Sequence, residues 1–232
     1  MAVDSFRHEN KYVINYMQYK TLRTVVKGVL QPDKHADKDG NYLIRSLYYD
    51  SPYNNTVLDK EFGVHKRAKI RIRTYGNENK LFFLEKKIKN DDSIAKQRAK
   101  LDLETYKNII NGKFNITGKN IHLDELQLYI KNQLLKPAVI VEYTKEVYVH
   151  PASTLRITFD KDIRSCMNCK DLLDPNPIKM RVLPDDYLIM EVKYNYYLPD
   201  FVRMLVSALN IEREGISKFE LCLNTVRPLN KL

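Results

Sequence analysis

Polar and apolar residues alternate along several segments of the chain. Lys69, Arg71 and Arg73 are separated by single isoleucines, so an extended segment would be cationic on one side and apolar on the other. The same two-residue period occurs in four other segments, which carry Arg7, Glu9 and Lys11; Glu85, Lys87 and Lys89; Arg156, Thr158 and Asp160; and Glu191 and Lys193. This pattern predicts strands with one polar face and one apolar face.

Helical and extended segments follow one another along the whole chain. Apolar residues with a helical period predict a helix over Met17–Leu30, which ends before a proline turn. Further helices are predicted over Leu103–Asn111, Leu123–Leu135, Asp200–Leu209 and Lys218–Thr225. Strands are predicted over Tyr42–Tyr49, Ala68–Tyr75, Lys80–Lys89, Ala138–Val149, Thr154–Asp160 and Tyr187–Tyr194. We therefore predict one α+β domain over residues 1–232, with a mostly antiparallel sheet and helices packed outside it or at one end.

The charged strand faces have two interpretations. A sheet with its apolar face on a core and its charged face in water is the common arrangement. However, these faces hold mostly Lys and Arg, and five segments share the pattern. We therefore favour a closed sheet whose cationic faces converge on a lumen, where a polyanion would neutralise them. The basic segment Ser93–Lys100 is either a further strand or a solvated loop.

The charge balance narrows the class of partner. The chain has 39 Lys and Arg against 29 Asp and Glu, a formal net charge of +10 among 232 residues. Such a surplus favours nucleic acid, acidic lipid or phosphorylated small molecules as partners. We expect no nucleic acid, because the basic strands lack an RNP-like aromatic motif and their cations would point into a narrow lumen.

Several other functions find no support in the sequence. The polar N-terminal segment is no secretory signal, and no apolar run approaches the roughly 20 residues of a membrane helix. Three cysteines provide no disulfide framework, so we expect a cytoplasmic protein. Cys166 and Cys169 form a C-x-x-C motif, but no second pair of metal ligands lies at a suitable spacing. The segment with these cysteines is expected to be a loop, and so is Asp171–Pro177.

Nine short motifs follow one another along essentially the whole chain: Glu9–Tyr12, Ser46–Ser51, Lys69–Tyr75, Phe83–Lys87, the basic segment with Lys96 and Arg98, Tyr143–Lys145, Leu155–Asp160, Met190–Lys193 and Ser217–Phe219. In their residues and in their order they resemble the VTC domain, the polyphosphate polymerase branch of the CYTH, or triphosphate tunnel, superfamily.

The resemblance implies an eight-stranded antiparallel tunnel that holds ATP and polyphosphate or triphosphate. It implies a polymerase that transfers the γ-phosphate of ATP to a growing chain. Catalytic cations would be Arg71, Arg73, Lys87, Arg156 and Lys218. Further phosphate-binding residues would be Lys11, Lys69, Lys89, Lys96, Arg98, Lys145 and Lys193. Glu191, with Glu9 and Glu85 as further candidates, would hold Mn²⁺ or Mg²⁺.

Two departures from the family pattern bear on the activity. Hydrolytic members of the superfamily begin with Glu-x-Glu-x-Lys, whereas Arg7 occupies the first Glu position here. This favours a polymerase over a metal-dependent triphosphatase. Polymerases of the family carry His where this chain has Lys89, which makes the charge there permanent. A triphosphatase and a non-catalytic polyanion-binding module remain the alternatives.

Overall fold

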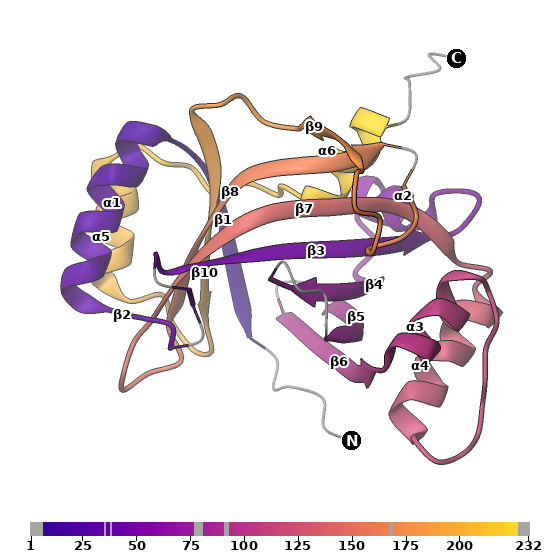
Figure 1. Cartoon of the computed structure of the whole chain (residues 1–232). Helices are drawn as coiled ribbons and strands as arrows, with labels where there is room; N and C mark the ends of the chain where they lie inside the picture. The colour runs from indigo at the N-terminus through magenta and orange to yellow at the C-terminus, as the bar shows by residue number, and fades with distance from the viewer. Residues whose placement is uncertain are drawn as a thin grey trace.

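The computed structural model describes residues 7–34, 36–37, 39–76, 81–90, 93–167 and 169–226. Strands and helices alternate throughout this part of the chain (Figure 1). The strands are β1 (His8–Asn15), β2 (Gln31–Pro32), β3 (Asn41–Asp50), β4 (Lys66–Tyr75), β5 (Phe82–Asn90), β6 (Ser93–Leu101), β7 (Lys136–Val149), β8 (Arg156–Met167), β9 (Ile178–Arg181) and β10 (Tyr187–Tyr194). The helices are α1 (Tyr16–Val29), α2 (Asn55–Glu61), α3 (Leu103–Ile110), α4 (Ile121–Asn132), α5 (Asp200–Ala208) and α6 (Lys218–Val226).

Eight strands form one antiparallel path in the order β1-β10-β8-β7-β3-β4-β5-β6, with the short strands β2 and β9 paired at the side of it. The two ends of the path meet at one point, where Arg7 and Ile94 exchange backbone hydrogen bonds of 3.2 and 3.1 Å. The ladder is therefore not closed along its whole length. The predicted α+β fold with an eight-stranded tunnel is confirmed, and Ser93–Lys100 belongs to a strand instead of a solvated loop.

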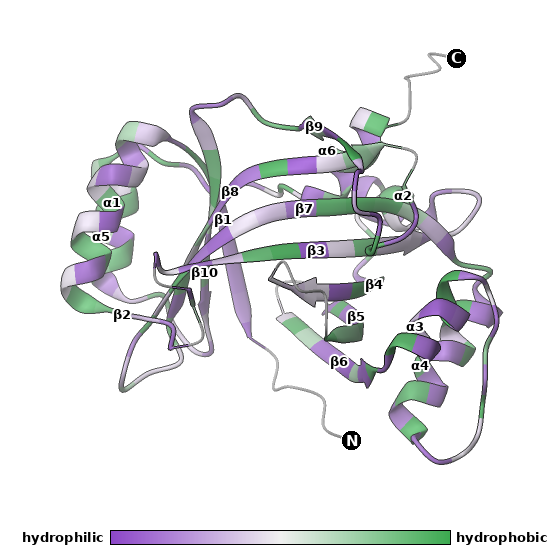
Figure 2. Ribbon diagram, in the orientation of Figure 1, coloured by the Kyte–Doolittle hydropathy of each residue, from purple (hydrophilic) through white to green (hydrophobic). Residues whose placement is uncertain are grey.

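Most helices cover the outer, apolar face of the sheet. Helices α1 and α5 lie side by side at one end, and α3 and α4 lie beside β5 and β6 at the other (Figure 1). Leu22 and Val202 join the outer apolar residues of β1, β8 and β10 in one core cluster. Tyr106 and Ile130 join those of β4, β5 and β6 in a second cluster. The strands change repeatedly between hydrophilic and hydrophobic along their length (Figure 2), as the two-residue period requires.

Helix α6 differs from the others because it packs on the inner side of the sheet. Phe219, Cys222 and Leu223 form a third core cluster with Ile44 and Val141. Val141 lies opposite Ser46, which in turn lies opposite Arg73, and directly opposed residues share a face. Part of the lumen is therefore an apolar core beneath α6, and only the remaining part is polar.

The sequence-based boundaries agree with the structure except in a few places. Strand β8 continues to Met167, beyond its expected end at Asp160, so Cys166 is in a strand and not in a loop. Leu172 is fully buried, although a surface loop was expected there. The expected start of a strand at Lys80 lies outside the described residues. Helix α2 and the short strands β2 and β9 were not predicted. No helix in the described ranges has the length and apolar character needed to cross a membrane.

A cationic cavity as the candidate functional site

The inner face of the sheet surrounds a cavity of about 330 Å³. Strands β1, β3, β4, β5, β6, β7 and β10 contribute to its wall, together with α2, α6 and the segment before α6. Twelve cationic side chains line it: Lys11, Lys60, Arg67, Lys69, Arg71, Arg73, Lys87, Lys89, Lys145, Lys193, Arg213 and Lys218. The acidic residues of the lining are Glu9, Glu191 and Glu214. The cavity is thus strongly cationic, and an anionic ligand would relieve the mutual repulsion of its walls.

Strand register explains why these charges converge. Glu9 lies directly opposite Lys193, and Lys11 lies opposite Glu191, across the β1–β10 ladder. Lys69 lies opposite Lys87 across the β4–β5 ladder. Directly opposed residues of antiparallel strands point to the same side of a sheet, so each pair adds two charges to the same surface.

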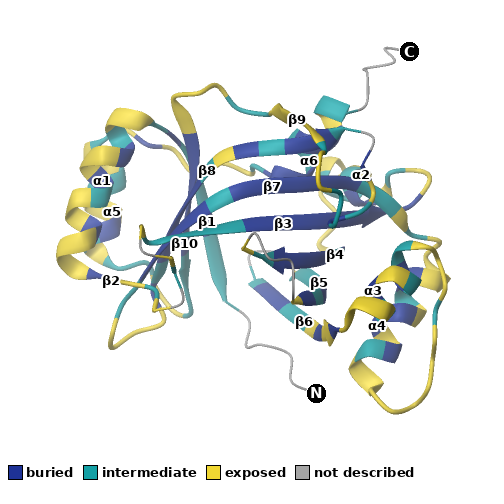
Figure 3. Ribbon diagram, viewed as in Figure 1, coloured by how far each residue is buried: buried dark blue, intermediate teal, exposed yellow. Residues whose placement is uncertain are grey.

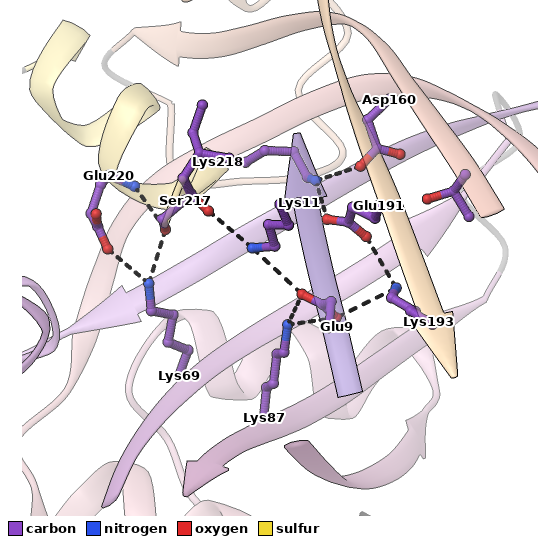
Figure 4. Close-up of polar contacts among 12 residues, drawn as sticks. Glu9, Lys11, Lys69, Lys87, Asp160, Glu191, Lys193, Ser217, Lys218 and Glu220 are labelled. Carbon is purple, nitrogen blue, oxygen red and sulfur yellow. Dashed lines mark hydrogen bonds and ion pairs between the residues drawn. The ribbon is translucent and has the colours of Figure 1, made fainter. Parts of the chain in front are cut away.

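Glu9 lies at the centre of one group of ion pairs (Figure 4). Its carboxylate is 2.8 Å from Lys87, 3.5 Å from Lys11 and 3.7 Å from Lys193. Burial raises the pKa of Glu9, but Lys87 and Lys193 outweigh it and hold the pKa well below its usual value. Burial also lowers the pKa of Lys87 to about 7, even though Glu9 opposes the shift.

Glu191 is the centre of the second group. Its carboxylate is 2.6 Å from Lys218, 3.1 Å from Lys193 and 3.6 Å from Lys145. Lys218 also binds Asp160, which lies 2.8 Å from Lys145 and is fully buried. Burial opposes the charged form of Glu191, yet the surrounding lysines lower its pKa well below the usual value. Two carboxylates and three ammonium groups are thus held together on β7, β8, β10 and α6. Figure 4 shows Asp160, Glu191, Lys193 and Lys218 of this group.

Two arginines of β4 are held rigidly by neighbouring strands. Arg71 donates to Glu85 at 2.8 Å and to the Tyr48 hydroxyl at 2.9 Å. Arg73 donates to Ser46 at 3.0 Å and to Tyr143 at 3.2 Å. Guanidinium groups oriented in this way are suited to bidentate contacts with phosphate oxygens.

The structure brings most of the predicted site residues together. Those that line the cavity are Glu9, Lys11, Lys69, Arg71, Arg73, Lys87, Lys89, Lys145, Glu191, Lys193 and Lys218. Glu85 is buried beside Arg71, and its carboxylate lies 3.4 Å from Arg98 and 3.7 Å from Lys96. Glu85, Lys96 and Arg98 do not line the cavity.

Arg156 does not line the cavity either. Its register opposite Lys193 places it on the inner face, but its side chain is 42% exposed and pairs with Asp33 at 3.1 Å. The two-residue period predicts the face correctly but not the position along the tunnel, which depends on how far the strands are staggered. The role of Arg156 as a phosphate contact therefore stays a prediction.

Several lining residues escaped the sequence analysis. Arg67 continues the alternation of Lys69 and Arg71 by one step, so the same period could have identified it. Lys60 belongs to α2, which has no clear sequence signal, and Arg213 lies in an irregular segment. Tyr48 and Tyr143 lie within two of the quoted motifs, but aromatic residues on the inner face were not considered as part of the site.

The carboxylates of the cavity fit a divalent cation that is also bound by substrate. Mg²⁺ is usually held by one or two carboxylates together with phosphate oxygens. Glu9 and Glu191 meet this requirement, since both line the cavity and both contact Lys193. A cage made by protein alone is not present, because the described residues contain no group of three or more His, Cys, Asp or Glu side chains that could hold a metal.

Comparison with known proteins agrees with this geometry. The sequence matches the VTC domain over residues 6–227. The chain belongs to the VTC domain family. No curated protein matches its sequence significantly.

Solved structures of other proteins share the fold of this VTC domain. A candidate adenylate cyclase from Bacillus halodurans is similar with a TM-score of 0.54 at 11% identity, over 91% of this chain and 93% of the other. HpAC1 from Hippeastrum, a candidate adenylyl cyclase with a dominant triphosphatase activity, is similar with a TM-score of 0.51 at 12% identity, over 97% and 98% of the two chains. At this identity the likeness establishes the fold alone.

Proposed function

We propose that this chain is an ATP-dependent polyphosphate polymerase, which transfers the γ-phosphate of ATP to the end of a polyphosphate chain. The observation that supports this most is the cavity itself, in which twelve cations face three carboxylates. Membership of the VTC domain family supports the same function. Phosphoryl transfer depends on positioning and charge neutralisation more than on covalent chemistry by the protein, and these side chains supply both.

The reaction needs no general base. A terminal phosphate of the growing chain is already anionic at neutral pH, so one of its oxygens can attack the γ-phosphorus of ATP directly. The new bond joins that oxygen to phosphorus, and the bond to the bridging oxygen of the β-phosphate breaks, so ADP leaves with the electron pair. Arg71 and Arg73 would orient phosphate oxygens, and Lys145 and Lys218 would stabilise charge that builds up during transfer. Glu191 and Glu9 would hold Mn²⁺ or Mg²⁺, which neutralises phosphate charge when bound.

Transfer to phosphate is favoured over transfer to water by the state of the cavity carboxylates. Hydrolysis needs a group that takes a proton from water. Glu9 and Glu191 each contact at least two lysines, which hold the pKa of both carboxylates well below the usual value and make them weak bases. The alternative of a metal-dependent triphosphatase remains, because the fold is shared with HpAC1 and Glu191 is in place. A binding module without turnover is the third alternative.

The deciding experiment incubates purified protein with ATP and either Mn²⁺ or Mg²⁺ and follows chain growth and free phosphate together. We expect long phosphate chains and ADP, with little free phosphate. Free phosphate without chain growth would establish the triphosphatase. Binding of polyphosphate with no turnover of ATP under either metal would establish the binding module.

A further inference from the structure

One carboxylate next to the cavity is bound to two of its cations. Glu220 on α6 lies 3.0 Å from Lys69 of β4 and also pairs with Lys60 of α2. Both lysines line the cavity, whereas Glu220 does not. The side chain of Lys60 is 31% exposed and that of Lys69 is 21% exposed. Both ammonium groups are therefore partly accessible to solvent while they line the cavity, Lys60 more than Lys69.

Hydrogen bonding around Lys69 resembles what an anion would meet there. Lys69 donates to the Ser217 hydroxyl at 2.9 Å, and Ser217 also lines the cavity (Figure 4). The Ser217 hydroxyl also accepts from the Glu220 backbone N–H at 3.5 Å, and the Glu220 carboxylate itself pairs with the two ammonium groups of Lys60 and Lys69. Two ammonium groups with a hydroxyl beside them suit a phosphate group as well as a carboxylate, since a hydroxyl can also donate. Burial raises the pKa of Glu220, but Lys69 and Lys60 lower it below the usual value, so the carboxylate is charged at neutral pH.

The structure assigns to Lys60, Lys69 and Ser217 a further phosphate-binding subsite at the rim of the cavity, which Glu220 occupies until a polyphosphate chain displaces it. This inference rests on the proposed function, because it identifies where a growing chain would extend beyond the inner cations, that is, the cationic cavity residues other than Lys60 and Lys69. The ligand is an internal phosphate group of an extended chain. Such a chain gains an ion pair with each lysine while its other phosphates stay on the inner cations, and the linked contacts favour it over the carboxylate.

The position of Glu220 agrees with a displaceable group. The residue lies two positions after Lys218, whose ammonium group is anchored to Asp160 and Glu191 in the opposite direction. Lys218 and Phe219 keep the start of α6 in place without Glu220, because both are buried in the interior. A change of side-chain rotamer at Glu220 is therefore enough to release Lys60 and Lys69, and the helix itself need not move.

Calorimetric titration with long-chain polyphosphate, without metal or ATP, tests the subsite in Glu220→Gln. The amide keeps the size of the side chain but frees both lysines, so affinity should rise about three- to tenfold. Glu214→Gln is the matched control, because it removes one negative charge from the cavity lining without freeing Lys60 or Lys69 and should raise affinity less. Tripolyphosphate should gain less than the long chain in Glu220→Gln, because three phosphates can be satisfied by the inner cations.

A second pair of variants covers the case in which Glu220→Gln folds poorly. Lys60→Gln should weaken long-chain binding by about threefold. The double variant Lys60→Gln with Glu220→Gln should lose most of the rise in long-chain affinity that Glu220→Gln alone produces, since only Lys69 remains to be freed. Unchanged or weaker long-chain affinity in a folded Glu220→Gln, or unchanged affinity in Lys60→Gln, would overturn the subsite.

The outcomes for the subsite and for the polymerase are separable. ATP turnover is measured in the same variants, independently of the titration. Tighter chain binding in Glu220→Gln, combined with absence of chain growth in the unmodified protein, would support the subsite and overturn the polymerase. Chain growth in the unmodified protein with no affinity change in Glu220→Gln would do the reverse.

Discussion

Ion pairs determine the charge states of individual side chains in the cavity more than burial does. Glu191 illustrates this, because burial by itself would favour its neutral form, and only the lysines around it keep it charged. Asp160 has a different place. It lies opposite Lys145 in the β7–β8 ladder, on the inner face of the sheet, and its contacts with Lys145 and Lys218 hold both ammonium groups beside Glu191. The same cations that would bind phosphate therefore also keep the proposed metal ligand ionised.

Glu191→Gln should separate binding from turnover. The substitution keeps the shape of the side chain but removes the charge that would hold a metal, and it makes the cavity more positive. We expect affinity for metal-free polyphosphate to stay the same or rise, while ATP turnover with Mn²⁺ or Mg²⁺ falls by at least about a hundredfold. Titration calorimetry and a product assay measure the two quantities.

Arg73→Gln serves as the contrasting variant, because it removes a cation of the lining and should weaken both binding and turnover. Turnover near the unmodified rate in Glu191→Gln would show that the metal is not held by this carboxylate.

Acid stability should depend on Glu146, which lies opposite Phe159 on the outer face of the sheet. Burial raises its pKa, but hydrogen bonds from Tyr148, Tyr19 and Arg23 lower it to about 2. Since the unfolded value is about 4.3, the stabilisation is complete above that pH and is lost as the pH falls towards 2. Glu146→Gln should lower the free energy of unfolding by roughly 2–3 kcal/mol at pH 7. Between pH 4.5 and about 2.5 the variant should then lose less further stability than the unmodified protein. Urea unfolding at several pH values measures this, and equal acid sensitivity in both proteins would contradict it.

At the scale of single elements, local sequence signals and long-range packing act together. Helix α1 begins with a capping box, in which Asn15 accepts from the backbone of Gln18 and the Gln18 side chain accepts from the backbone of Asn15. The same helix is secured to the sheet by Tyr19 and Arg23, which both donate to Glu146. Exposed and buried positions alternate clearly along α1 (Figure 3).

Asn15→Ala should destabilise the protein by about 1 kcal/mol, because the backbone N–H of Gln18 at the start of α1 loses its side-chain acceptor. Affinity for polyphosphate should not change, since α1 packs on the outer face of the sheet. Thr21→Ala, at an exposed position of the same helix, is the control and should have a smaller effect. Thermal unfolding and polyphosphate titration of both variants provide the comparison, and loss of binding in Asn15→Ala would contradict separate roles for the two faces.

At the scale of the whole molecule, the excess of positive charge is concentrated inside the sheet. Twelve cations converge on one cavity, and part of the remaining lumen is filled by apolar residues of α6. Unfolding would separate the cations, so their repulsion opposes the folded state in the absence of a ligand. A polyanion that binds the folded chain removes this repulsion.

Tripolyphosphate or polyphosphate should therefore raise the melting temperature. At a free concentration one hundred times the dissociation constant, the gain of about 2.7 kcal/mol corresponds to roughly 5–11 °C for a chain of this size. The shift should shrink at higher salt concentration, because salt screens the contacts with phosphate. Sulfate at the same ionic strength is the control. An equal shift with sulfate, or no shift with polyphosphate at modest salt, would contradict the tunnel as a polyphosphate site.

The sequence by itself determined which side chains share a face. The alternation around Lys69 and Glu191 is local, because successive residues of any strand point to opposite sides. The strands, most helices and the family could therefore be predicted without a structure. The departure at Arg7 could also be read from the chain, and the preference for a polymerase that rests on it stays a prediction.

The tertiary structure alone decided which of these faces meet, and where along the tunnel. Lys60 and Glu220 are 160 residues apart, and their contact depends on the path of every strand between them. Arg156 lies on the expected face but outside the cavity lining, because position along the tunnel follows from the stagger of all eight strands and not from the period of one. The insertion of α6 also had no local signal, since an amphipathic helix can bury its apolar side on either face of a sheet.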